Sequence, residues 1–196
     1  FYEISRRAKS LGFYAGLSTN GTLIDETQID EIDDINYDYV GVSIDGMKDT
    51  RDKFRRLDGA FDKSMHGIRL CRDRGLKVGL RFTMTQDNAA ELDDMLDLLD
   101  REGIDRFYFS HLNYAGRGNH NRKDDAFFQM TRRAMDTLFE RCLDGIRNGE
   151  QKEIVTGNND ADGVYLLMWI EKNFPEHAAH MREKLVQWGG NASGVN

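Results

Sequence analysis

The sequence is poor in cysteine and proline, and the shortage of cysteine argues against disulfides and cysteine-ligated metal sites. Only two cysteines and one proline occur among 196 residues. Cys71 and Cys142 lie far apart, each within a helical pattern, so we expect two buried thiols and neither a disulfide nor a metal site. A protein without disulfides fits a reducing, cytoplasmic compartment.

Long apolar runs and an excess of positive charge are also lacking. No run approaches the roughly 20 apolar residues that a membrane-spanning helix needs, and no signal peptide is visible. The formal net charge is −7, so nonspecific binding to nucleic acid or to an anionic membrane has no electrostatic support. The chain also has no nucleophile elbow, phosphate-binding loop or paired-histidine metal motif, which argues against those classes of enzyme.

What the sequence does have is a regular alternation of strand and helix patterns. Helical spacing of apolar residues follows the first strand, at Ile29, Ile32 and Ile35. A charged loop is expected after the second strand, before a helix that starts near Asp62. The alternation predicts an α/β fold with a parallel sheet, and after about residue 120 the pattern changes to helices. The expected strands are 13–18, 38–44, 76–85 and 105–112.

Small polar residues finish each expected strand. The carboxyl ends of parallel strands meet at one edge of a sheet, where α/β proteins bind their ligands. Taken alone, each motif is also a plausible turn, because Asn and Gly tolerate left-handed backbone. Together they suit the hydroxyl groups and amino-acid end of a polar small molecule. The motifs are Ser18-Thr19-Asn20-Gly21, Ser43-Ile44-Asp45-Gly46, Thr83-Met84-Thr85 and Ser110-His111-Leu112-Asn113.

Several of these segments resemble a known enzyme family. "LSTNGTLI", "VGVSIDG", "RDKFRRLDGAFDKSMHGIR" and "GLRFTMT" are similar to the third, fourth and fifth strand regions of radical S-adenosylmethionine (SAM) enzymes of the branch with a SPASM-type carboxyl-terminal domain. "YFSHLNYAGRG", "VTGNNDADGVYLLMW" and "VQWGGNASGVN" resemble the NirJ family of heme d1 biosynthesis. The resemblance implies a truncated, partial (β/α) barrel over 1–120 and a helical extension over 121–196 that leads to an auxiliary-cluster domain.

The resemblance also implies cofactors whose ligands this chain does not carry. Radical SAM enzymes bind SAM and a 4Fe-4S cluster, and the SPASM branch adds an auxiliary 4Fe-4S cluster. The family's three-cysteine motif is absent from the sequence, and Cys71 and Cys142 cannot replace it. We therefore expect a fragment of a longer protein, with cluster ligands upstream of Phe1 and beyond Asn196 and an electron donor such as ferredoxin or flavodoxin.

Six residues are implied as SAM contacts. In the family, the residues matching Ser43 and Asp45 lie beside the ribose and the amino-acid end of SAM, and Thr19 and Asn20 line the same rim.

Two arginines, Arg56 and Arg81, match positions that hold the SAM carboxylate, which a guanidinium grips through two hydrogen bonds. Arg55 is the adjacent alternative to Arg56, and a salt bridge to a core acid is the alternative for Arg81. Arg51 departs from the family, where His often precedes the Asp.

Three residues near the end of the last strand are implied as substrate contacts: His111, Asn113 and Arg117. In a tetrapyrrole enzyme such groups meet propionate carboxylates or an axial iron position. His111 has a plain alternative as a hydrogen-bonded structural residue. The implied activity is removal of propionate side chains from 12,18-didecarboxysiroheme by a 5′-deoxyadenosyl radical. The alternatives are oxidative decarboxylation of iron-coproporphyrin, peptide modification by a SPASM enzyme, and a non-catalytic barrel module.

Overall fold

The computed structural model describes residues 1–150 and 152–187, apart from the side chains of Phe54 and Arg117. It divides into two compact units. The first unit comprises Phe1–Phe82 and Ala90–Tyr108, and the second comprises Thr83–Ala89 and the chain from Phe109 onward.

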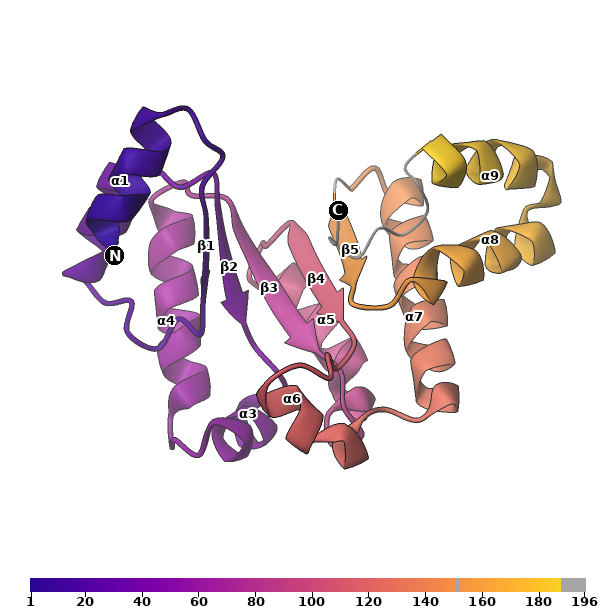
Figure 1. Ribbon diagram of the computed structural model, residues 1–196, viewed down its shortest axis with the longest axis horizontal. Coiled ribbons are helices and arrows are strands. Elements are labelled where there is room, and N and C mark those ends of the chain that lie inside the picture. The colour runs from indigo at the N-terminus through magenta and orange to yellow at the C-terminus, as the bar shows by residue number, and fades with distance from the viewer. Residues whose placement is uncertain (151, 188–196) are drawn as a thin grey trace. The chain divides into compact units, whose positions relative to one another are not determined.

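One sheet contains β1 (Gly16–Thr19), β2 (Tyr39–Ser43), β3 (Val78–Thr83), β4 (Arg106–Ser110) and β5 (Glu153–Gly157). The strands lie in the order β1-β2-β3-β4-β5, so strands that follow one another in sequence are neighbours in the sheet. β2 pairs in parallel with both β1 and β3, and the arrows of β2, β3 and β4 point the same way in Figure 1. The predicted α/β class with a parallel sheet is confirmed.

The register of the ladder separates two faces of the sheet in the first unit. Because side chains alternate along a strand, residues paired across parallel strands share a face. Leu17 pairs with Val40, and Val42 pairs with Leu80, so these buried apolar residues form one face. The other face carries Ser18, Gly41, Ser43, Gly79 and Arg81.

Three helices of the first unit bury apolar stripes to form the core: α2 (Gln28–Ile35), α4 (Ala60–Asp73) and α5 (Leu92–Arg101). The first helix, α1 (Tyr2–Ser10), buries Ser5 and leaves Ile4 exposed. The α2 stripe predicted from spacing is buried, and α4 contacts both α2 and β2. Burial of such stripes is the main source of stability for short helices. The buried stripes are Ile29, Ile32 and Ile35 on α2, Met65, Ile68 and Cys71 on α4, and Leu92, Met95, Leu96 and Leu99 on α5.

A further helix, α3 (Lys48–Arg55), replaces the charged loop expected after β2 and lies beyond the carboxyl end of that strand (Figure 1). The loop prediction is wrong because α3 has no apolar stripe to reveal it. Among the described side chains of α3, Arg51 is buried, and it is fully enclosed.

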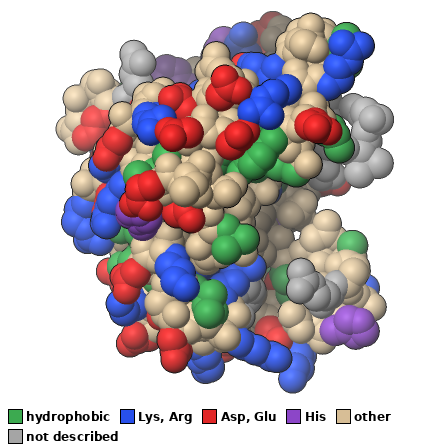
Figure 2. Space-filling model, turned by 90° about the vertical axis from the view of Figure 1, so that its left-hand side faces the viewer, with side chains coloured by type: hydrophobic (Ala, Val, Ile, Leu, Met, Phe, Trp, Pro, Cys, Tyr) green, Lys and Arg blue, Asp and Glu red, His purple; other side chains and the backbone are tan. Residues whose placement is uncertain are grey.

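The surface around α1 carries both signs of charge. Arg6 pairs with Glu31 and Asp34, and Arg74 pairs with Asp30 and Asp33. Figure 2 shows acidic and basic side chains interspersed on this side of the molecule, with only small hydrophobic areas between them. Such exposed pairs add little stability individually, but they place positive charges beside the acidic helix α2, so the face does not carry a field of one sign.

The second unit is mainly helical. It contains α6 (Arg117–His120), α7 (Phe128–Arg147), α8 (Ala161–Asn173) and α9 (Ala178–Gln187) together with β5, which the sequence patterns did not predict. The helices after residue 120 agree with the predicted change in pattern. In the described part of the chain, no helix has the length and apolar character needed to cross a membrane.

Candidate functional site

Polar side chains from three adjacent strands share one face of the sheet in the first unit. Ser43 on β2 pairs directly with Arg81 on β3. Arg81 Nη1 donates a hydrogen bond to Ser18 Oγ on β1 at 2.5 Å. Ser18, Ser43 and Arg81 therefore share one face of the sheet, whereas Thr19 pairs with Val42 on the opposite face. The described partners of Arg81 are the Ser18 hydroxyl and the Tyr108 ring, which differ from the core acid that its alternative would require.

A tyrosine ring and a glycine position the Arg81 side chain. Its Cζ lies 4.7 Å from the centroid of the Tyr108 ring, within the range of cation–π interactions. A Cβ atom at Gly41 on β2 would lie 2.9 Å from Cδ of Arg81 and 2.8 Å from Cε1 of Tyr39. Because Gly41 has no side chain, Arg81 can reach across β2 to Ser18.

A second arginine–tyrosine stack lies on the same face. Arg106 Cζ is 4.6 Å from the centroid of the Tyr39 ring. A Cβ atom at Gly79 would lie 2.8 Å from Cε2 of Tyr39, so this ring covers both Gly41 and Gly79. Tyr39 and Arg106 are the first residues of β2 and β4. The stack therefore lies at the amino ends of the strands, while Ser43 lies at a carboxyl end.

The segment after β1 is a tight turn held by Thr19 and Asn20. Thr19 Oγ1 accepts a hydrogen bond from the Gly21 amide at 3.1 Å, and Asn20 Oδ1 accepts one from the Thr22 amide at 3.0 Å. Gly21 has a φ of 74°, which favours glycine. We call residues 18–21 and 43–46 the strand-end rim. The side chains of Thr19 and Asn20 therefore stabilise a turn, which is the alternative that the sequence of this motif predicts.

The segment after β2 presents a buried carboxylate to two arginines. Asp45 is 4% exposed. Its Oδ2 accepts hydrogen bonds from Arg51 Nη1 at 3.2 Å and from Arg55 Nη2 at 2.8 Å. Arg56 comes next in the chain, where it caps the end of α3 with a left-handed φ of 52° and an exposed side chain. Of the two alternatives, Arg55 is thus the one that contacts a predicted site residue.

Arg51 is the most enclosed charged side chain at the rim, with no exposed surface. Desolvation by burial, reinforced by the neighbouring charge of Arg55, lowers the pKa of Arg51 to about 10. The guanidinium therefore keeps its positive charge at neutral pH. Sequence reasoning noted only its departure from the family, because a buried arginine has no signature in apolar periodicity.

Glu91, at the start of α5, secures the same segment from another direction. Its Oε2 accepts a hydrogen bond from the Met47 amide at 2.7 Å, and its Oε1 accepts one from Thr50 Oγ1. Gly46, which precedes Met47, has a φ of 141°, and a Cβ atom there would lie 2.7 Å from Glu91 Oε2. Glu91 was not predicted as part of the site, because it belongs to an otherwise ordinary acidic helix start.

The predicted substrate residues belong to the second unit. His111 Nε2 lies 3.0 and 3.1 Å from the two carboxylate oxygens of Asp162, and the ring meets Phe109 edge-on. Asn113 is exposed. Arg117 begins α6, but its side chain lies outside the described residues. Asp162, a buried residue of the "VTGNNDADG" segment, was not predicted as a partner of His111.

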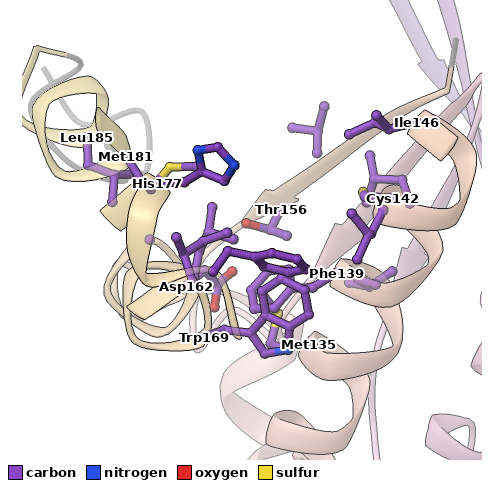
Figure 3. Close-up of a pocket in the computed structure, with 18 residues that line it drawn as sticks. Met135, Phe139, Cys142, Ile146, Thr156, Asp162, Trp169, His177, Met181 and Leu185 are labelled. Atoms are coloured by element: carbon purple, nitrogen blue, oxygen red, sulfur yellow. The ribbon is translucent and has the colours of Figure 1, made fainter. Parts of the chain in front are cut away.

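A cavity of about 630 Å³ lies between helices of the second unit (Figure 3). Phe139 and Trp169 pack against each other in its wall, with ring centroids 5.5 Å apart. Asp162 also lines it, but His111 and Asn113 do not. The lining is mainly apolar: Met135, Leu138, Phe139, Cys142, Leu143, Ile146, Ile154, Val155, Leu166, Trp169, Ile170, Phe174, Met181 and Leu185.

Neither cysteine fits an iron–sulfur ligand. Burial raises the pKa of the Cys71 thiol to about 11, and it also raises that of Cys142, whereas cluster ligands are thiolates. Among the residues the structure describes, no group of three or more His, Cys, Asp or Glu side chains is placed to hold a metal ion.

The sequence is similar to curated enzymes along nearly its whole length. It is 51% identical to the pre-heme d1 synthase of Dinoroseobacter shibae over 99% of this chain, and 41% identical to the Fe-coproporphyrin III synthase of Methanosarcina barkeri over 98%. It covers 48% of each relative, so the chain spans about half the length of the curated relatives it matches. The resemblance to heme d1 proteins is confirmed.

Solved structures and a family model agree on the fold. Streptococcus suis SuiB bound to the precursor peptide SuiA matches with a TM-score of 0.67 at 14% identity, over 88% of this chain and 40% of that one. The structure of anSMEcpe with bound AdoMet and a peptide matches with a TM-score of 0.60 at 22% identity, over 72% of this chain and 40% of that one. The predicted partial barrel is thereby confirmed. The model of the radical SAM superfamily matches residues 1–99, and the chain belongs to this superfamily.

Proposed function

We propose that this chain is part of a radical SAM enzyme of heme d1 biosynthesis that removes propionate side chains from 12,18-didecarboxysiroheme. The observation that carries the proposal is the 51% identity to a pre-heme d1 synthase over 99% of the chain. The 41% identity to an Fe-coproporphyrin III synthase makes iron-coproporphyrin the second candidate substrate. Both are iron tetrapyrroles with acidic side chains, so the substrate class is common to the two.

The family implies SAM and a 4Fe-4S cluster, which together supply hydrogen-atom abstraction through a 5′-deoxyadenosyl radical. The polar face fits SAM because it offers groups of the required kinds. Ser43 and Asp45 suit the ribose and the amino-acid end, and Thr19 and Asn20 shape the rim.

Arg81, together with Arg55 or Arg56, suits the SAM carboxylate. The contacts of Arg55 with Asp45 favour Arg55 over its neighbour. The stack on Tyr108 and the bond to Ser18 orient Arg81 before any ligand arrives, which reduces the entropy lost on binding.

Contacts with the acidic tetrapyrrole are assigned to His111, Asn113 and Arg117. An arginine suits propionate carboxylates, and an exposed asparagine can donate a hydrogen bond from its amide. The carboxylate of Asp162 orients the His111 ring through Nε2. Residues 1–120 would then form the partial barrel, and 121–196 the extension toward an auxiliary-cluster domain. The complete protein would act in the cytoplasm with a ferredoxin or flavodoxin as electron donor.

The test uses the full-length protein, reconstituted with iron and sulfide without oxygen and supplied with SAM and a reductant. Mass spectrometry would follow 5′-deoxyadenosine and the tetrapyrrole product. We expect loss of propionate side chains from 12,18-didecarboxysiroheme and little change in iron-coproporphyrin III. Turnover of iron-coproporphyrin III alone would establish the second candidate. SAM cleavage with neither tetrapyrrole processed would overturn the substrate class, and absence of a cluster would favour a non-catalytic module.

A further inference from the structure

We propose that Arg51 is a positioning residue for SAM, which holds Asp45 and Arg55 at the strand-end rim by joining three separate segments of the chain. The inference rests on the proposed function, because it takes the rim to be where SAM binds. Arg51 would touch no ligand itself, since its side chain has no exposed surface.

The contacts of Arg51 reach the segments after both β1 and β2. Nη1 donates to Asp45 Oδ2 at 3.2 Å, which secures the segment after β2. Nη2 donates to the Asn20 carbonyl at 3.1 Å, which secures the turn after β1. The same nitrogen lies 3.1 Å from Ser64 Oγ on α4, and this hydroxyl is also 2.7 Å from the Asn20 carbonyl. One side chain therefore joins two strand ends to a helix of the core.

An arginine is required for this role because three partners lie in different directions. Its planar guanidinium presents five N–H donors in a fixed arrangement, whereas a lysine ammonium is a compact charge on a flexible stem. Burying such a charge is costly unless it is paired and hydrogen-bonded. Asp45 provides the paired negative charge. Because the buried guanidinium must stay paired, it also restricts the position of the Asp45 carboxylate.

Arg55 is the accessible member of this group of side chains. Asp45 Oδ2 accepts hydrogen bonds from both Arg51 and Arg55. The side chain of Arg55 is 31% exposed while those of Arg51 and Asp45 are 0% and 6% exposed. A carboxylate such as that of SAM would therefore meet Arg55, whose place depends on Asp45 and, through it, on Arg51.

The experiment compares SAM affinity with thermal stability in the full-length, reconstituted protein. The variants are Arg51→Met, Arg51→Lys and Ser64→Ala, with Cys71→Ala as the control for core damage, because Cys71 is fully buried on the same helix as Ser64. Equilibrium dialysis gives the Kd for SAM, and amide hydrogen exchange reports on residues 19–22 and 44–47. Ser64→Ala keeps the Arg51–Asp45 pair, so it remains informative if Arg51→Met does not fold.

We expect Arg51→Met to raise the Kd about 10- to 100-fold, the range typical of misplaced binding groups. Arg51→Lys should raise it less, Ser64→Ala should raise it slightly, and all three should speed exchange at the rim. Cys71→Ala should lower the Tm with the Kd unchanged. The inference is overturned if the Arg51→Lys and Ser64→Ala proteins bind SAM like the wild type, or if Cys71→Ala raises the Kd as much as they do for an equal loss of Tm. A wild-type protein that does not bind SAM overturns the proposed function and this inference together.

Discussion

Arg81 on β3 reaches over Gly41 of the intervening strand β2 and donates a hydrogen bond to Ser18 on β1. The two residues are 63 positions apart in the chain, yet their contact depends on one missing side chain between them. The polar face therefore depends on the absence of a side chain at Gly41 in the strand between them.

Gly41→Ala should disturb that face directly. The added methyl group would lie within 3 Å of both Arg81 and Tyr39, and overpacking of this kind costs about 1–3 kcal/mol of unfolding free energy. We expect a lower Tm and weaker SAM binding in the full-length protein. Gly16→Ala is the matched control, because a Cβ there meets its nearest neighbour at 3.8 Å. Equal effects of both substitutions would show that Gly41 has no special role.

Arg55→Ala should weaken SAM binding more than Arg56→Ala. Arg55 donates to the buried carboxylate of Asp45 at 2.8 Å, whereas Arg56 is exposed at the end of α3. Loss of a charged hydrogen-bonding group costs about 1.5–3 kcal/mol, so the Kd for SAM should rise roughly 10- to 100-fold in Arg55→Ala. Calorimetric titration of SAM measures both. The opposite order would assign the carboxylate contact to Arg56.

Arg117→Ala should separate tetrapyrrole turnover from SAM cleavage. A guanidinium that binds a substrate carboxylate contributes nothing to cleavage in the absence of substrate, so 5′-deoxyadenosine formation without tetrapyrrole should stay at the wild-type rate while turnover falls about tenfold or more. Arg133→Ala, on the exposed surface of α7, is the control. If SAM cleavage declines as much as turnover, Arg117 belongs to the cofactor site or to the scaffold.

Asp52→Asn should lower stability in a pH-dependent way. The Asp52 carboxylate accepts hydrogen bonds from the Phe61 and Gly59 amides at the start of α4, and chiefly the Phe61 bond lowers its pKa. A depressed pKa stabilises the folded state above the unfolded value of about 3.9 and loses that contribution as the pH falls through the folded value. The Tm difference from the wild type should therefore be largest above about pH 5 and should shrink below about pH 4.

Asp49→Asn, at an exposed position on α3, is the control for that comparison. A Tm difference that stays constant between neutral pH and pH 3 would mean that the Asp52 carboxylate does not act through its charge.

Much of the first unit could be predicted because its elements bury apolar residues at regular spacing. Ile29, Ile32 and Ile35 mark α2 in the sequence and are buried in the structure. By contrast, α3 buries an arginine, and β5 is only partly buried, so neither carries a hydrophobic pattern. Hydrophobic periodicity reveals elements that bury apolar side chains, and α3 and β5 are stabilised by other interactions.

The candidate site shows a similar division. Ser43 was identified by its place at a strand end and Arg81 by the family resemblance, and the ladder brings them together. The partners that orient the site were not identified, because Tyr108 and Asp162 gain their roles only through contacts with residues distant in the chain. No local pattern distinguishes such a tyrosine or aspartate from many others.

The alternation of side chains between the two faces of the sheet couples the proposed SAM-binding face to the core. Arg81 and its neighbour Leu80 point to opposite sides of the same short strand, one toward polar groups and one into the apolar interior. An insertion or deletion of a single residue within β3 would exchange those two directions, placing the arginine among aliphatic side chains and removing it from the proposed SAM-binding face. Length changes in this family should therefore be confined to the connections, while the strands themselves can vary only by substitution.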